Sequence, residues 1–130
     1  MDTSALIAFV DVSDTYHPLF RRLFAEPPKD LFTSSSVVTE GHAWFLKRYD
    51  RTRALQFLSM IEDMPFLDVV GVGPPEMAGG TSMLRKFSDQ NLTLVDAVGL
   101  YLMKARKSKT CWSTDRHLGL TGVRLAIHEH

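Results

Sequence analysis

One stretch decides the fold of this chain: TLVDAVGLYLMKARKSKTCWSTDRH, which spans Thr93–His117. Its pattern predicts a helix that is followed directly by a buried strand, Thr110–Thr114. Asp96 falls in the first turn of the helix, and Asp115 comes immediately after the strand. The sequence neighbours of Asp96 are apolar, so a carboxylate there has little solvated surface to face. The two acids are therefore candidates for a functional site.

The segments on either side alternate between strand-like and helix-like patterns. Strands are predicted at three short apolar runs: Asp30–Ser34, Phe66–Val70 and Val123–His128. Helices are predicted at Ala5–Val10, Asp14–Ala25, Val37–Tyr49, Arg51–Glu62 and Pro74–Phe87. We expect Ser4 to cap the first of these helices and the serines at 34–36 to cap the third. This alternation predicts an α/β domain with a mostly parallel sheet.

The start of the chain lacks one element of that pattern. An α/β sheet usually begins with an apolar strand, but only Met1 precedes Asp2. Either the first strand is very short, or residues upstream of Met1 are missing from the numbered chain.

Length and composition limit the class of protein. A chain of 130 residues suits one domain, residues 1–130. The formal net charge is zero, so any nucleic-acid surface must be a local patch. The single cysteine, Cys111, excludes an internal disulfide framework and a cysteine-based zinc site. Its apolar neighbours indicate a buried thiol, which fits a reducing cytoplasm. No apolar run approaches the roughly 18 residues of a membrane span, and we expect no signal peptide.

Four acids map to one edge of the predicted sheet. In open parallel sheets, ligands bind outside the carboxyl ends of the strands. Asp115 lies at such an end, and Asp2 lies at another if the residues before it form a strand. Asp96 begins a helix on the same side, and Glu40 falls early in the helix that follows strand Asp30–Ser34.

Each acid also has a purely structural explanation. Asp96 follows Thr93 by three residues, which is the spacing of a capping box, and it complements the helix dipole. Glu40 could lie at the edge of an apolar helix face, Asp115 could be a turn residue, and Asp2 a flexible terminal residue. The convergence of all four on one edge favours a common site.

A cluster of carboxylates requires a cation. Two carboxylates about 5 Å apart repel by roughly 3 kcal/mol at an effective dielectric of about 20. Hard oxygen ligands select Mg²⁺ or Mn²⁺. The chemistry that suits such a site is metal-assisted hydrolysis of a phosphodiester.

These residues resemble a known family. The pattern is Asp2-Thr3-Ser4 before an apolar helix, Glu40 early in a helix, Leu92 to Asp96-Ala97 at the start of a late helix, and Ser113-Thr114-Asp115 after a buried strand. Taken in this order, it resembles a PIN domain, and most of all the VapC-type toxins of toxin–antitoxin systems. The resemblance covers nearly the whole chain.

The resemblance implies a fold and an activity. The fold would be a three-layer α/β/α sandwich with a central, mostly parallel sheet of four to five strands. The activity would be that of a Mg²⁺- or Mn²⁺-dependent endoribonuclease, which is inhibited by a cognate antitoxin and usually forms a homodimer.

The resemblance also implies site residues. Asp2, Glu40, Asp96 and Asp115 match the acidic quartet. In this hypothesis Asp2 and Asp96 hold the metal most directly, while Asp115 and Glu40 complete the cluster through waters and orient the attacking hydroxide. Ser113 matches a small hydroxyl residue that supports the site.

The chain departs from the family after its last acid. Many relatives carry a further acid soon after that position, where this chain has Arg116 and His117. These two residues, together with Arg85 and Lys86, are candidates for RNA contacts, although a solvated surface also explains them.

Two other classes remain open from the sequence. One is an inactive PIN scaffold that binds RNA or a protein partner. The other is a receiver-like signalling domain, which also gathers acids and Mg²⁺ at a sheet edge, although the expected pair of a strand-ending Asp and a later strand-ending Lys is not found.

Overall fold

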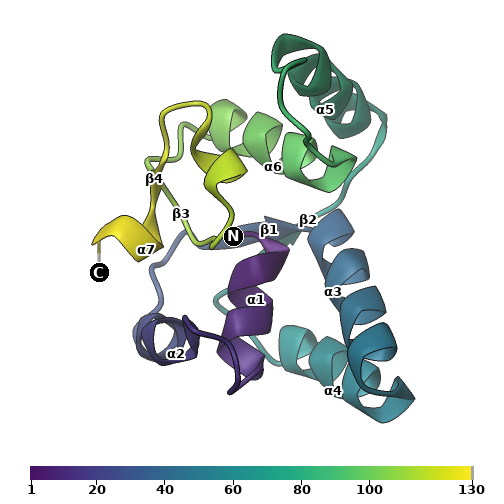
Figure 1. Ribbon diagram of the computed structural model, residues 1–130, viewed down its shortest axis with the longest axis vertical. Helices are drawn as coiled ribbons and strands as arrows, with labels where there is room; N and C mark the ends of the chain where they lie inside the picture. Colours follow the sequence, from purple (N-terminus) through teal and green to yellow (C-terminus); the bar gives the residue numbers. More distant parts are fainter. Residues whose placement is uncertain (130) are drawn as a thin grey trace.

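The computed structural model describes residues 1–129 and shows a mixed α/β fold (Figure 1). The chain forms, in order, α1 (Thr3–Val10), α2 (His17–Ala25), β1 (Phe32–Ser34), α3 (Ser35–Arg48), α4 (Arg51–Glu62), β2 (Asp68–Val70), α5 (Pro74–Lys86), α6 (Leu94–Ala105), β3 (Thr110–Cys111), the 3₁₀ helix η1 (Arg116–Gly119), β4 (Arg124–Leu125) and α7 (Ala126–Glu129). Helices α5 and α6 lie on one side of the strands, and α1, α2 and α4 lie on the other (Figure 1).

The strands form two parallel pairs that the start of the chain connects. Strand β1 pairs with β2, and β3 pairs with β4. The backbone nitrogen of Met1 donates to the carbonyl oxygen of Phe32 at 2.8 Å, and that of Asp2 donates to Trp112 at 2.9 Å. The Thr33 hydroxyl donates to the Met1 carbonyl at 2.7 Å. Met1 and Asp2 therefore lie where the sequence lacked a first strand.

The strands are shorter than the sequence predicts. Each of the four has two or three residues, because only that many backbone groups find a partner strand. A single sheet of four to five strands stays a prediction, since the described residues form two-stranded pairs.

Two local predictions are wrong. Ser4 does not cap α1: Asp2 occupies the N-cap position, and the Ser4 hydroxyl donates to the Asp2 carboxylate instead. The predicted strand Val123–His128 is a strand only over β4 and then becomes α7, because only Arg124 and Leu125 have β3 beside them. The predicted serine cap of α3 is confirmed, because the Ser34 side chain accepts a hydrogen bond from the Val37 amide. The predicted start of α5 at Pro74 is also confirmed, with Pro75 next to it in the first turn.

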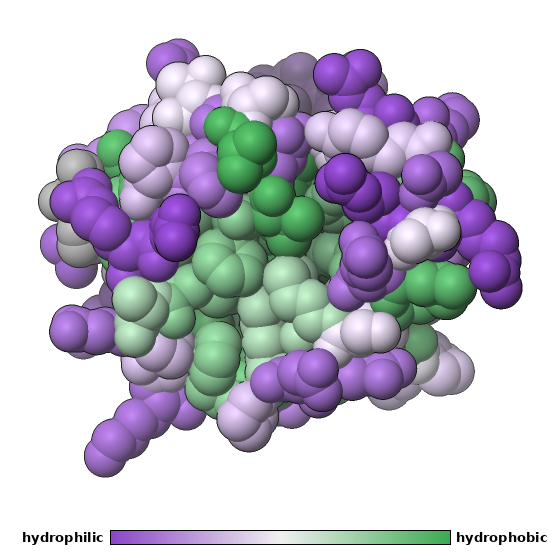
Figure 2. Space-filling view, turned by 90° about the horizontal axis from the view of Figure 1, so that it is seen from below, coloured by the Kyte–Doolittle hydropathy of each residue, from purple (hydrophilic) through white to green (hydrophobic). Residues whose placement is uncertain are grey.

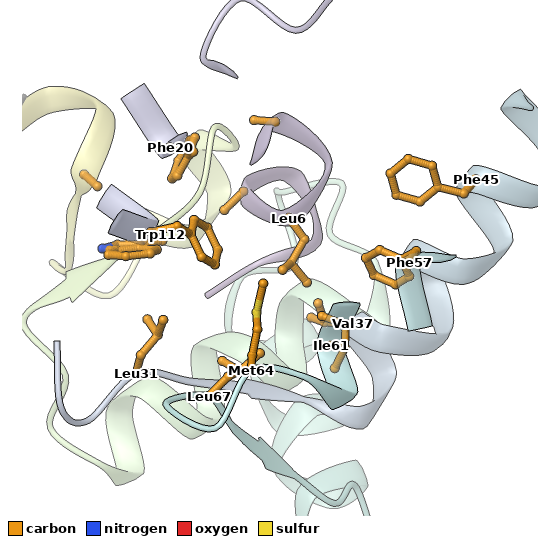
Figure 3. Packing of buried hydrophobic residues seen from close by; sticks show 14 of the residues in the cluster. Leu6, Phe20, Leu31, Val37, Phe45, Phe57, Ile61, Met64, Leu67 and Trp112 are labelled. Atoms are coloured by element: carbon orange, nitrogen blue, oxygen red, sulfur yellow. The ribbon is translucent and has the colours of Figure 1, made fainter. Parts of the chain in front are cut away.

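The core consists of two clusters of buried apolar side chains. The first lies between α1, α2, α3 and α4 and includes the fully buried Leu6, Phe20 and Phe57 (Figure 3). The second is built from α5, α6, β3, η1 and β4. The adjacent residues Cys111 and Trp112 belong to different clusters, so β3 and the residue after it separate the two.

Helices α5 and α6 pack very closely. A Cβ atom at Gly79 would overlap the ring of Tyr101, and one at Gly80 would lie 2.7 Å from a methyl group of Val98. The two glycines therefore let α5 approach α6, although they lower the intrinsic helix propensity of α5.

One face of the molecule is partly apolar. Figure 2 shows the side on which α1, α2 and α4 lie, with apolar side chains across its centre and polar side chains around them. No helix in the described part of the chain is long and apolar enough to cross a membrane.

Candidate active site

Asp2 is a buried carboxylate that two serine hydroxyls hold. The residue is 7% exposed, and its Oδ2 atom accepts hydrogen bonds from Ser4 Oγ at 2.9 Å and Ser113 Oγ at 3.0 Å. Ser4 Oγ also accepts from the Thr114 amide at 2.9 Å. The first residues of the chain are thereby fixed against the segment that follows β3.

Ser113 joins two of the candidate acids. Its side chain is completely buried, and its Oγ accepts from the Asp115 amide at 2.8 Å while it donates to Asp2. One hydroxyl therefore fixes the Asp2 side chain and the Asp115 backbone together. Ser4 lies 3.1 Å from the same hydroxyl. In the sequence, Ser4 lies two residues after Asp2, just as Ser113 lies two residues before Asp115. This spacing is the signal that could have identified Ser4.

Asp96 lies in the first turn of α6 and forms a capping box with the N-cap residue Thr93. The Thr93 hydroxyl accepts from the Asp96 amide at 3.1 Å, and Asp96 Oδ2 accepts from the Thr93 amide at 3.4 Å. The capping box predicted from the spacing of Thr93 and Asp96 is thus confirmed. The residue is nevertheless only 9% exposed, and burial raises its pKa above the ordinary 3.8. The negative charges of Asp2 and Asp115 raise the pKa of Asp96 further.

Asp115 caps the N-terminus of η1, beside His117. Its Oδ1 atom accepts from the His117 amide at 3.0 Å and lies 3.2 Å from His117 Nδ1. Both side chains are about one third exposed, with 35% for each. One ligand atom from each of Asp96, Asp115 and His117 lies within 4.8 Å of the other two.

The donors in this cluster fit a divalent metal ion. Carboxylate oxygens suit Mg²⁺ and Mn²⁺, and imidazole nitrogens suit the transition metals. The repulsion that raises the pKa of Asp96 is the interaction that a cation relieves. The residues that could hold the ion are Asp2, Asp96, Asp115 and His117.

Glu40 lies apart from that cluster. It is half-buried on α3 and lines a groove of about 390 Å³ with Ser36, Thr39 and Val95. Val95, which lines this groove, immediately precedes Asp96 in α6. The other three predicted acids are brought together, whereas the role of Glu40 stays a prediction.

Basic side chains line two neighbouring grooves near the C-terminal end of the chain. Arg116, Arg124 and His128 line one groove of about 470 Å³. Lys86 lines another, of about 440 Å³, together with Lys104 and Lys107. The two grooves share Leu120 and Val123.

The predicted RNA contacts divide between this surface and other positions. Arg116 and Lys86 line the grooves, His117 lies in the acidic cluster, and Arg85 is exposed in the last turn of α5. No sequence pattern singles out Arg124, which lies in the strand that pairs with β3.

The fold is similar to that of a known toxin. No protein-family model matches the sequence, and none of the curated proteins matches it either. A solved structure does match: the crystal structure of Mycobacterium tuberculosis VapC20, a toxin that cleaves the sarcin–ricin loop. The TM-score is 0.85, and the match covers 94% of this chain and 93% of that chain at 20% sequence identity. The resemblance to a VapC-type PIN domain is therefore confirmed at the level of the fold.

Proposed function

We propose that this chain, which has the fold of a VapC-type PIN domain, is a divalent-metal-dependent endoribonuclease and the toxin of a type II toxin–antitoxin pair. One observation carries the proposal. Acids from distant parts of the sequence converge: ligand atoms of Asp96 and Asp115 lie within 4.8 Å of each other, and the Ser113 hydroxyl bonds both the Asp2 carboxylate and the Asp115 amide. A protein has no structural need to assemble such a cluster in a half-buried position.

The three acids would hold Mg²⁺ or Mn²⁺. Ser4 and Ser113 keep the Asp2 carboxylate in place by donating to Oδ2. Glu40, from its groove beside Val95, would orient the attacking water. The chemistry that a bound divalent cation supplies is activation of water and stabilisation of charge on the scissile phosphate.

The RNA strand would run from the acids over the two basic grooves. Arg116 directly follows Asp115, and the first groove leads through Leu120 and Val123 to the second. Arginine and lysine side chains along such a path contact phosphates irrespective of base sequence. His117 and Arg85 would flank this path.

We further expect a cognate antitoxin and a homodimer in the cytoplasm. The apolar face in Figure 2 is where a protein partner would gain most from burial, because contiguous apolar patches mark interaction sites. Size-exclusion chromatography with light scattering measures the oligomeric state.

A small gene for a DNA-binding protein beside this reading frame would support the antitoxin.

The experiment that tests the activity is cleavage of a structured RNA with Mg²⁺ or Mn²⁺, with chelator, and with Asp96→Asn. We expect cleavage only by the wild type with metal. The variant should lose at least about a hundredfold in rate, since even supporting residues at metal sites cost about 10–100-fold. Asn keeps the size of the side chain and an oxygen that can accept from Thr93, so circular dichroism should show a folded variant.

Undiminished cleavage in chelator would exclude the metal mechanism. RNA binding without cleavage, and without heat on metal titration, would identify an inactive scaffold instead. The receiver-like alternative has lost its support, because the fold matches a VapC toxin over nearly the whole chain.

A further inference from the structure

His117 stands where its ring can join the acidic cluster. One of its ring nitrogens lies within 4.8 Å of a carboxylate oxygen of Asp96 and one of Asp115. Its amide donates to Asp115 Oδ1, so the backbone of η1 fixes the start of the side chain at the site. About a third of the side chain is exposed.

The chemistry of this donor set differs from that of an all-carboxylate site. Mg²⁺ binds oxygen ligands almost exclusively and keeps several waters. Imidazole is a ligand of transition metals, and their affinity for mixed nitrogen and oxygen sites rises from Mn²⁺ towards Cu²⁺. A nitrogen donor among carboxylates therefore favours Mn²⁺ over Mg²⁺.

We propose that His117 is a direct ligand of the metal and that it sets a preference of this site for Mn²⁺ over Mg²⁺. The inference rests on the proposed function only for the presence of a divalent site. It adds the identity of a ligand and the class of ion: a transition metal that accepts imidazole.

Binding of the metals alone, without RNA, tests this inference. The affinities for Mn²⁺ and Mg²⁺ are measured by calorimetry on the wild type and on His117→Asn. We expect the variant to bind Mn²⁺ about tenfold more weakly or worse, the range seen when supporting groups at metal sites are lost. Its affinity for Mg²⁺ should change by less than about threefold, because Mg²⁺ replaces a nitrogen ligand with water. The matched control is His128→Asn, which removes an exposed imidazole from the groove behind η1 and should change neither affinity.

A spectroscopic measurement detects the nitrogen ligand directly. Pulsed electron paramagnetic resonance of the Mn²⁺ complex detects a directly bound nitrogen as modulation of the spin echo. We expect that modulation in the wild type and in His128→Asn, and its loss in His117→Asn.

The outcomes separate this inference from the proposed function. If the wild type binds Mn²⁺ without nitrogen modulation, and His117→Asn has the same affinities, His117 only pairs with Asp115 and the inference is wrong while the metal site stands. If the wild type binds neither ion, the proposed function fails and the inference fails with it.

Discussion

Asp96 both caps a helix and contributes to a cluster of like charges. The capping interaction favours its ionised form, whereas burial and the charges of Asp2 and Asp115 oppose it, and the opposing effects prevail. Functional sites often contain such a group, because the surrounding residues are arranged for a ligand and not for stability.

The pH dependence of stability follows from the raised pKa of Asp96. The folded protein binds a proton at Asp96 more tightly than the unfolded chain, whose ordinary pKa is 3.8. The stabilising contribution of protonated Asp96 is therefore complete below that pH and is lost as the pH rises through the folded pKa. With chelator present, we compare the free energies of unfolding of Asp96→Asn and the wild type. The variant should become more stable relative to the wild type as the pH increases through the folded pKa of Asp96. Urea unfolding at a series of pH values measures the difference; a difference that does not vary with pH would contradict it.

We expect the Ser113 hydroxyl to contribute to both the stability of the fold and the affinity for metal. Ser113→Ala removes the hydroxyl that bonds Asp2 and the Asp115 amide, and it leaves buried groups without a partner. We expect a loss of about 1–3 kcal/mol in the free energy of unfolding. Metal affinity should fall as well, because Asp2 and Asp115 are no longer fixed together. Ser59→Ala, at an exposed position of α4, is the control and should change neither quantity.

The sequence predicted the acids but not how they are held. Asp96 stands out because its neighbours are apolar, Asp115 stands out because it follows a predicted buried strand, and Ser113 was found through the resemblance. Ser4 was misassigned as a helix cap, since its partners Ser113 and Thr114 lie 109 and 110 residues away and no local pattern points to them. His117 was considered for RNA contact, but only the folded chain shows it beside Asp96.

At the scale of elements, the contact between α5 and α6 depends on Gly79. Gly79→Ala would push a methyl group into the Tyr101 ring and should lower the free energy of unfolding by about 1–3 kcal/mol, as overpacking does. Gly99→Ala on α6 is the matched control. A Cβ there would be in ordinary contact with Leu118, at 3.4 Å, so the gain in helix propensity should raise stability by up to about 1 kcal/mol. Thermal unfolding compares the two, and equal effects would show that the close packing is unimportant.

Helices were easier to predict than strands. The apolar spacing and caps of α3, α4 and α5 are local signals, and the bounds of each of these helices lie within two residues of the predicted ones. Strand length depends on which partner is present, and Val123–His128 has a strand-like pattern although β3 accompanies only two of its residues. The close approach of α5 to α6 also depends on the partner, so the two glycines that permit it look in the sequence like residues that only weaken a helix.

At the scale of the whole molecule, zero net charge requires that any RNA affinity come from a local surface. Arg116→Ala combined with Arg124→Ala should weaken RNA binding, because the two substitutions remove two phosphate-binding side chains. The slope of log K against log salt concentration should fall by about 1.5 as a result. Arg21→Ala with Arg22→Ala, on exposed positions of α2, removes the same charge away from the grooves. Filter binding at several salt concentrations gives both slopes. If the α2 pair lowers the slope as much, the grooves are not the RNA path.

The hydrogen bonds that join Asp2 and Ser4 to Ser113 and Thr114 link residues 109 to 111 positions apart. During synthesis, the ribosome adds one partner of each bond more than a hundred residues before the other. Asp2 therefore lacks its hydrogen bond from Ser113 until more than a hundred further residues have been added. A nascent chain that stops before Asp115 lacks one of the acids and cannot assemble the cluster. If the protein cuts RNA, the ribosome that makes it therefore carries an inactive chain at least until Asp115 has been added.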